Sequence, residues 1–191
     1  MPTVALDANF LSILLDDKTR IPADPSTQRP FERAQERIQY LIEELQDKNA
    51  KILIPTPALA EFLILAYPDG AAYLQHIKST YRFELVDFDE MAAIELAELA
   101  VKIGKPKRKP RVKRDEETWA KLKYDRQILA ISLAHTIETL YSADGPLREL
   151  AKSNGINVVG LADLPMPPPK QMPLLTAQNV VSIAEAKDGG K

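Results

Sequence analysis

Short apolar runs alternate along this chain with stretches of helical periodicity, and this alternation constrains the fold more than any other feature. Strands that alternate with helices are typical of βαβ units, which build a mostly parallel sheet with helices on both faces. We therefore expect an α/β domain of three layers, α/β/α. The predicted strands are Val4–Leu6, Ile52–Ile54, Phe83–Val86, Thr139–Tyr141 and Asn157–Val159.

Helices are predicted between these runs from apolar spacing and composition. Apolar residues recur at spacings of three and four over 31–45, which indicates an amphipathic helix. Ala58–Ala66 is expected to be a buried helix, with Thr56 as N-cap and Pro57 at the first position. Further helices are predicted at Met91–Ile103, Glu116–His135 and Gly145–Ser153, with Asn154-Gly155 as a left-handed stop after the last.

Length and composition describe one domain followed by a tail. With 191 residues, 45% of them hydrophobic and 27% charged, the chain resembles an ordinary soluble globular protein. The domain is expected to span residues 1–164. Five prolines between Pro165 and Pro173 then favour extended chain, so residues 165–191 are predicted to form a proline-rich, flexible tail.

Several classes of protein are disfavoured by what the sequence lacks. The chain has no cysteine, which excludes disulfides and thiolate metal sites and fits a reducing cytoplasm. No signal-peptide pattern is visible at the N-terminus, and no apolar run approaches the ~18 residues of a membrane span. We therefore expect a cytoplasmic protein with no membrane partner.

Two aspartates follow predicted strands directly. Asp7 ends the first apolar run, and Asp144 comes soon after the fourth. Open α/β sheets bind ligands at the carboxyl ends of their strands, so both residues lie at a ligand-binding edge if the two strands are neighbours. Asp is also a favoured helix N-cap, and each residue taken alone is equally well explained as a cap.

Two further carboxylates lie on predicted helices with apolar neighbours three and four residues away. These are Glu61 and Asp125. Burying an unpaired carboxylate is strongly unfavourable, so something must compensate its charge. A basic side chain such as Lys123 or Arg126 is one candidate, and a cation is the other. Because two such residues accompany two strand-end aspartates, the sequence favours a cation site.

Basic residues crowd into the segment 102–114, which contains no acid. Pro106 and Pro110 are expected to keep it extended as a flexible arm. Such residues neutralise phosphates and give salt-sensitive affinity for nucleic acid, although long charge runs are often only solvated loops. Because the segment leads into the helix that carries Asp125, we favour contact with nucleic acid. The eight residues are Lys102, Lys105, Lys107, Arg108, Lys109, Arg111, Lys113 and Arg114.

Four short motifs, taken in order, resemble those of the PIN-domain nucleases, many of which are toxins of VapBC-type toxin–antitoxin pairs. The resemblance covers about residues 1 to 164. It implies a PIN-like α/β/α domain and Mg²⁺- or Mn²⁺-dependent endoribonuclease activity on single-stranded RNA. It also makes an antitoxin protein and a homodimer the expected protein partners. The motifs are Leu6-Asp7-Ala8-Asn9, Pro57–Phe62, Tyr124–Ala130 and Ser142-Ala143-Asp144-Gly145.

The resemblance also assigns roles to residues. Small polar residues near the metal fall on Asn9 and Ser142, which we predict to bind substrate together with the basic segment. Some members carry a further acid where this chain has Pro146-Leu147, which leaves open whether one or two ions bind. The catalytic and metal-binding acids are expected to be Asp7, Glu61, Asp125 and Asp144.

Two alternatives belong to other functional classes. A non-catalytic RNA-binding or scaffolding domain would use the basic segment, but such a domain has no need to gather carboxylates that repel one another. An aspartyl-phosphate enzyme also places an aspartate at a strand end. The haloacid-dehalogenase type needs a second aspartate two residues later, where this chain has Asn9.

Overall fold

The computed structural model describes residues 2–24, 26–103 and 113–168, with the backbone alone for 103 and 113–120. Its five strands form one sheet in the order β3-β2-β1-β4-β5, and every neighbouring pair is parallel. All five predicted strands are confirmed, with ends that differ by at most one residue. They are β1 (Thr3–Leu6), β2 (Lys51–Pro55), β3 (Phe83–Val86), β4 (Thr139–Tyr141) and β5 (Asn157–Val159).

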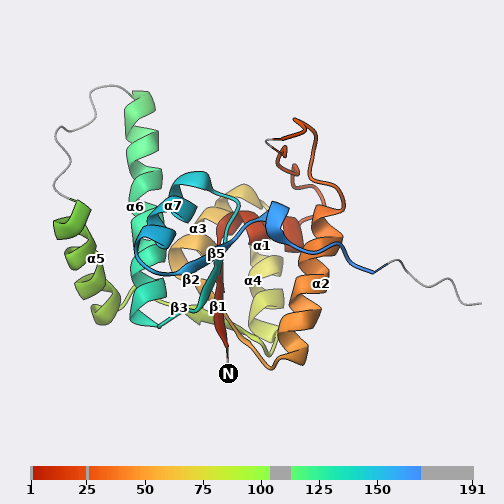
Figure 1. Cartoon of the computed structure of the whole chain (residues 1–191), viewed down its shortest axis with the longest axis horizontal. Coiled ribbons are helices and arrows are strands. Elements are labelled where there is room, and N and C mark those ends of the chain that lie inside the picture. The colour runs from red at the N-terminus through yellow and green to blue at the C-terminus, as the bar shows by residue number, and fades with distance from the viewer. Residues whose placement is uncertain (1, 25, 104–112, 169–191) are drawn as a thin grey trace, which may run out of the picture.

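Helices cover both faces of the sheet, which confirms the three-layer expectation (Figure 1). One face carries α1 (Ala8–Leu15), α2 (Ala34–Asp47) and α4 (Gly70–Ser79). The other carries α6 (Lys113–Ala134) and α7 (Gly145–Ser153), with α5 (Glu90–Ile103) packed against α6. Helix α3 (Thr56–Leu65) contributes to both cores, and a short 3-10 turn follows β5 at Leu161–Asp163. No helix among the described residues combines the length and apolar character needed to cross a membrane.

The central strands are apolar throughout because both of their faces are buried. Side chains alternate along a strand, so Leu6 and Ile52 face the core beneath α1 and α2. Ala5 and Leu53 face the opposite core, against α6. A strand covered on both sides shows no polar alternation, which is why continuous apolar runs identified these strands.

Helix boundaries required three corrections. Thr56 is the first residue of α3 rather than its N-cap; Pro55 holds that position, and no side chain caps the helix. Helix α6 begins at Lys113, three residues before the predicted start at Glu116. Helix α4 was not predicted, because Ile77 is its only buried residue and its apolar pattern is correspondingly weak. The predicted left-handed stop is confirmed at Gly155, whose φ is +85°.

Candidate functional site

The strand order brings the two strand-end aspartates together. Strands β1 and β4 are neighbours, with Leu6 opposite Tyr141, so the residues that follow them meet at the carboxyl edge of the sheet. The backbone N–H of Asp7 donates to the carbonyl oxygen of Tyr141 at 3.1 Å and extends the pairing by one residue. The condition set for Asp7 and Asp144, that their strands be adjacent, is therefore met.

Asp7 is both a helix cap and a member of the site, because its two oxygens have different partners. Its Oδ1 accepts from the N–H of Phe10 at 2.8 Å and caps α1. Its Oδ2 accepts from the hydroxyl of Ser142 at 2.5 Å. The residue is only 3% exposed. Burial raises the pKa of Asp7 to about 6; these two hydrogen bonds partly oppose that rise, and the charges of Asp144 and Glu61 add to it.

Asp144 divides its oxygens in the same way. Its Oδ1 accepts from the N–H of Leu147 at 3.0 Å and caps α7, and its Oδ2 lies 2.5 Å from Nζ of Lys121. Ser142 connects the two aspartates: its fully buried hydroxyl donates to Asp7 and accepts from the N–H of Asp144 at 3.0 Å. Each aspartate thus uses one oxygen on a helix and presents the other to the site.

The two helical acids lie close to these aspartates but in different surroundings. Asp125 is 4% exposed, and no hydrogen bond or ion pair reaches it from the described part of the chain. Burial raises the pKa of Asp125 to about 7, with Asp144 as the next cause. Glu61 is half-buried, and burial raises its pKa as well. Helix α3 was predicted to be buried along its whole length, but its last turn is exposed: Ile64 and Leu65 are 70% and 62% exposed.

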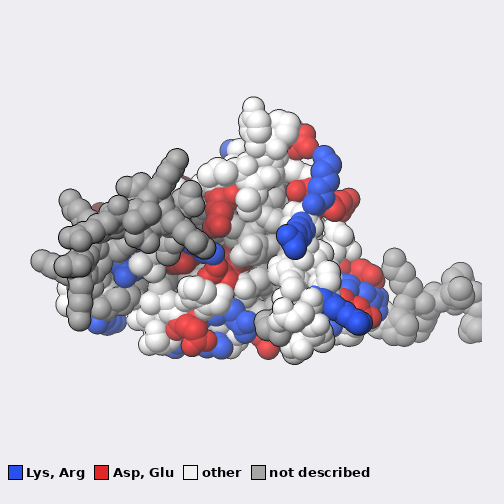
Figure 2. Space-filling view, turned by 90° about the horizontal axis from the view of Figure 1, so that it is seen from above, with Lys and Arg blue, Asp and Glu red and all other residues white. Residues whose placement is uncertain are grey.

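All four acids line one small pocket at this edge of the sheet. Figure 2 looks onto this edge of the sheet and shows acidic surface gathered near the middle of the face, with basic surface beside it. The remaining lining includes Asn9 and Lys121. The structure therefore assembles the acids and both small polar residues, with Asn9 in the pocket lining and Ser142 hydrogen-bonded to Asp7 and Asp144. Their roles as ligands, catalysts and substrate-binding groups stay predictions.

Lys121 supplies the basic side chain of the pocket. The sequence analysis allowed for a basic partner but named only Lys123 and Arg126 as examples, and helix geometry explains why Lys121 takes this place. Residues four apart lie on the same face of a helix, so Lys121 shares the face of Asp125, whereas Lys123 points elsewhere and is exposed. The Nε of Arg126 is buried without a hydrogen-bond partner in the described structure. The spacing of four from Asp125 was available in the sequence and would have identified Lys121.

The donor set suits a hydrated divalent ion better than a fully protein-coordinated one. Among the described residues, no three Asp, Glu or His side chains converge closely enough to enclose a metal. Magnesium usually takes only one or two carboxylates and keeps several waters, so Asp7 and Asp144, with Asp125 nearby, are sufficient oxygen donors. Burial is the main cause of the raised pKa values of Asp7 and Asp125, and repulsion from the neighbouring acids adds to it.

A larger hollow of about 450 Å³ adjoins the acidic pocket, and Asn9 lines both. It follows the groove between α1 and the end of α3, where Tyr67 contributes an aromatic ring that is 85% exposed. Lys18 and Arg20 contribute positive charge to its wall, and Asp16 and Asp69 contribute negative charge, with Lys18 Nζ 3.5 Å from Oδ2 of Asp69. Sequence analysis did not find this hollow, because its lining comes from two stretches that are far apart in the sequence, 9–20 and 65–73.

The basic segment 102–114 is only partly described. Lys102 is exposed in the last turn of α5, and the backbone of Lys113 and Arg114 belongs to α6. Lys102 lies in the helix that was predicted to end at Ile103, whereas the expectation of extended chain was wrong for Lys113 and Arg114, where α6 begins earlier than predicted. The predicted substrate-binding residues Lys105, Lys107, Arg108, Lys109 and Arg111 lie outside the described residues, as do residues 169–191 of the predicted tail.

No protein-family model matches the sequence, and no curated protein matches it. The fold does match solved structures. One is VapBC2 from Rickettsia felis bound to a DNA fragment from its promoter, with a TM-score of 0.54 and 15% identity over 83% of this chain and 98% of that one. The fold is a VapC-like PIN fold. DNA-bound VapBC from Salmonella typhimurium matches with a TM-score of 0.50 and 18% identity, over 84% of this chain and 99% of that one. Identities this low describe the fold, so any activity must be argued from the site.

Proposed function

We propose that this protein is a Mg²⁺- or Mn²⁺-dependent endoribonuclease that cuts single-stranded RNA at the acidic pocket. The observation that carries the proposal is Asp125. A carboxylate that is 4% exposed, without a partner in the described structure and beside three other acids, is strongly unfavourable unless a cation joins it. The PIN-like fold with its VapBC neighbours is consistent with a nuclease of this type.

Each residue of the pocket has a distinct task in this proposal. Asp7 and Asp144 hold the ion through their Oδ2 atoms, the oxygens that do not cap helices. Asp125 and Glu61 complete the negative charge as ligands or as acceptors for the attacking water. Ser142 fixes the orientation of Asp7. A bound divalent ion supplies Lewis-acid activation of water and stabilises charge on the phosphate.

The substrate is proposed to enter through the hollow that adjoins the pocket. Asn9 lies on the boundary between the two spaces, where its amide can donate to a phosphate oxygen. Arg20 supplies positive charge for a neighbouring phosphate, and the exposed ring of Tyr67 is suited to stacking on an unpaired base. The basic segment 102–114 is proposed to add sequence-independent affinity for the same strand.

Protein partners are proposed from the fold neighbours and from one apolar surface. Both neighbours are VapBC complexes, and we propose an antitoxin partner and a homodimer for this chain as well. At the end of α3, Ile64, Leu65 and Tyr67 are 70%, 62% and 85% exposed. A contiguous apolar surface of this kind is typical of protein interfaces, and we assign it to the antitoxin.

The test is cleavage of labelled single-stranded RNA in Mg²⁺ or Mn²⁺, with and without EDTA. Cleavage that requires metal and is lost in Asp7→Asn, but kept in the control Glu138→Gln, supports the proposal. Glu138 is an exposed acid outside the pocket. If a folded protein cuts no RNA of a broad panel and calorimetry detects no metal binding, the protein is instead a non-catalytic RNA-binding or scaffolding domain.

A further inference from the structure

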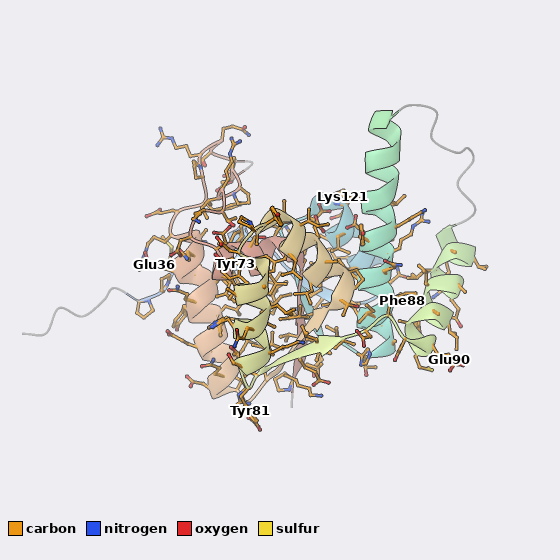
Figure 3. All side chains as sticks on the ribbon, turned by 180° about the vertical axis from the view of Figure 1, so that it is seen from behind. Glu36, Tyr73, Tyr81, Phe88, Glu90 and Lys121 are labelled. Atoms are coloured by element: carbon orange, nitrogen blue, oxygen red, sulfur yellow. The ribbon has the colours of Figure 1, made fainter. Side chains whose placement is uncertain are left out.

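Lys121 occupies the centre of the proposed metal site. Its Nζ lies 2.5 Å from Oδ2 of Asp144, and the charges of Asp125 and Glu61 also act on it. Among the described residues, it is the only Lys or Arg that lines the acidic pocket. Figure 3 shows Lys121 on the side of α6 that faces the rest of the domain rather than α5. One positive charge within the chain thus already lies against Asp144, while Asp125 has no hydrogen bond or ion pair among the described residues.

The ammonium group of Lys121 and a divalent ion require the same atom. Oδ1 of Asp144 is engaged by the N–H of Leu147, which leaves Oδ2 as the oxygen that faces the pocket. The ammonium group already lies 2.5 Å from that oxygen, so an ion bound to Oδ2 would place two positive charges against the same atom, where they repel each other. One cation must leave before the other binds.

We propose that Lys121 is the resident cation of the metal-free site, and that a divalent ion binds by displacing its ammonium group from Asp144. This inference rests on the proposed function, because it assumes that the pocket takes a metal. The side chain of Lys121 is suited to exchange, since it is 51% exposed and its flexible stem carries a compact charge that can swing into solvent. The apparent metal affinity is then set by competition within the chain.

The experiment is a calorimetric titration of the full chain with Mn²⁺ in wild type, Lys121→Met and Lys121→Gln. Met preserves the length of the side chain, and Gln preserves a hydrogen-bond donor without the charge. Both should bind Mn²⁺ about tenfold more tightly, which corresponds to about 1.4 kcal/mol and is somewhat above the usual range for an exposed ion pair. Lys121→Arg, which keeps the charge, should stay close to wild type. Lys123→Met on the exposed side of the same helix is the matched control and should leave the affinity unchanged.

Thermal unfolding supplies a second readout that does not depend on activity. In EDTA, the Met and Gln variants should unfold at lower temperature than wild type, because their acids lack a compensating cation. The increase in Tm on adding Mn²⁺ should be larger in these variants than in wild type. Equal or weaker Mn²⁺ binding by both variants, while wild type binds, overturns the inference alone. Failure of wild type and variants alike to bind Mn²⁺ removes the proposed metal site itself.

Discussion

Replacing Asp7 by Asn should stabilise the metal-free protein at alkaline pH, although it removes a proposed ligand. Burial raises the pKa of Asp7 from 3.8 to about 6. A carboxyl group whose pKa is higher in the folded state resists ionisation there, so its charge opposes folding. The penalty is absent below the unfolded pKa of 3.8, grows as the pH rises, and reaches its full size above the folded pKa of about 6.

The size of the effect follows from the shift. Two pKa units correspond to about 3 kcal/mol, at about 1.4 kcal/mol for each unit. The Asn side chain can still accept from the N–H of Phe10, but it loses the hydroxyl donated by Ser142, a loss of about 1 kcal/mol. A net gain of about 2 kcal/mol is therefore expected at about pH 8, or about 4–8 °C in Tm for a domain of this size.

The assay is urea unfolding in EDTA at about pH 8 and about pH 4, on either side of the titration. At the lower pH, the gain should disappear or become a small loss, because wild-type Asp7 is then protonated. The exposed control Glu138→Gln should show no such pH dependence. In saturating Mn²⁺, the order should reverse, since wild type gains binding energy that the variant lacks. An Asn variant that is less stable than wild type at both pH values, or that differs equally at both, would refute this reasoning.

Four further predictions concern individual side chains and the basic segment. Ser142→Ala removes a hydrogen bond that lowers the pKa of Asp7. The carboxyl carbon of Asp7 should therefore titrate at higher pH by NMR, and Mn²⁺ should bind more weakly. An unchanged titration of Asp7 would contradict the assigned contact. Arg20→Ala should weaken binding of single-stranded RNA with little effect on Mn²⁺ affinity. Neutralising the eight basic residues of 102–114 should weaken RNA binding and flatten the salt dependence of the RNA affinity. If the neutralised variant binds RNA as well as wild type at low salt, the segment is only solvated surface. Phe62→Ala empties a fully buried site against Tyr73 and should lower the free energy of unfolding by about 3–5 kcal/mol in urea, whereas Tyr81→Ala, at an exposed ring, should have little effect.

The sheet and the strand-end half of the site could be predicted because local sequence determines them. A short apolar run followed by Asp, as at Leu6-Asp7, both ends a buried strand and caps the next helix. Because Asp can both end the strand and cap the helix, its position in the sequence identifies the carboxyl edge of the sheet. The sequence did not show which strands are adjacent, so the adjacency of the first and fourth strands was only a condition. The pairing of β1 with β4 meets that condition and makes Asp7 and Asp144 neighbours.

The remainder of the site depends on tertiary geometry that local patterns do not record. Glu61 has apolar neighbours in the sequence, but α3 extends past the edge of the sheet, so that Ile64 and Leu65 are exposed instead of covering it. The hollow beside Asn9 combines α1, the following loop and the end of α3, which no single motif contains. The weak apolar pattern of α4 gave no signal of its own, because only Ile77 is fully buried and its other core contacts come from the partly buried Tyr73 and Leu74.

The contact between Ser142 and Asp7 joins residues 135 positions apart, and this separation has a consequence during translation. Strand β2 emerges soon after β1, but β4, the other neighbour of β1, emerges only after residue 138 has been added. At about 5–20 residues per second, β1 spends on the order of ten seconds with one edge unpaired on the ribosome. Over the same interval, Asp7 has neither Ser142 nor Asp144 beside it. The acidic pocket can therefore assemble only when the domain is nearly complete. A shorter nascent chain on the ribosome does not carry the pocket near the mRNA that is being translated.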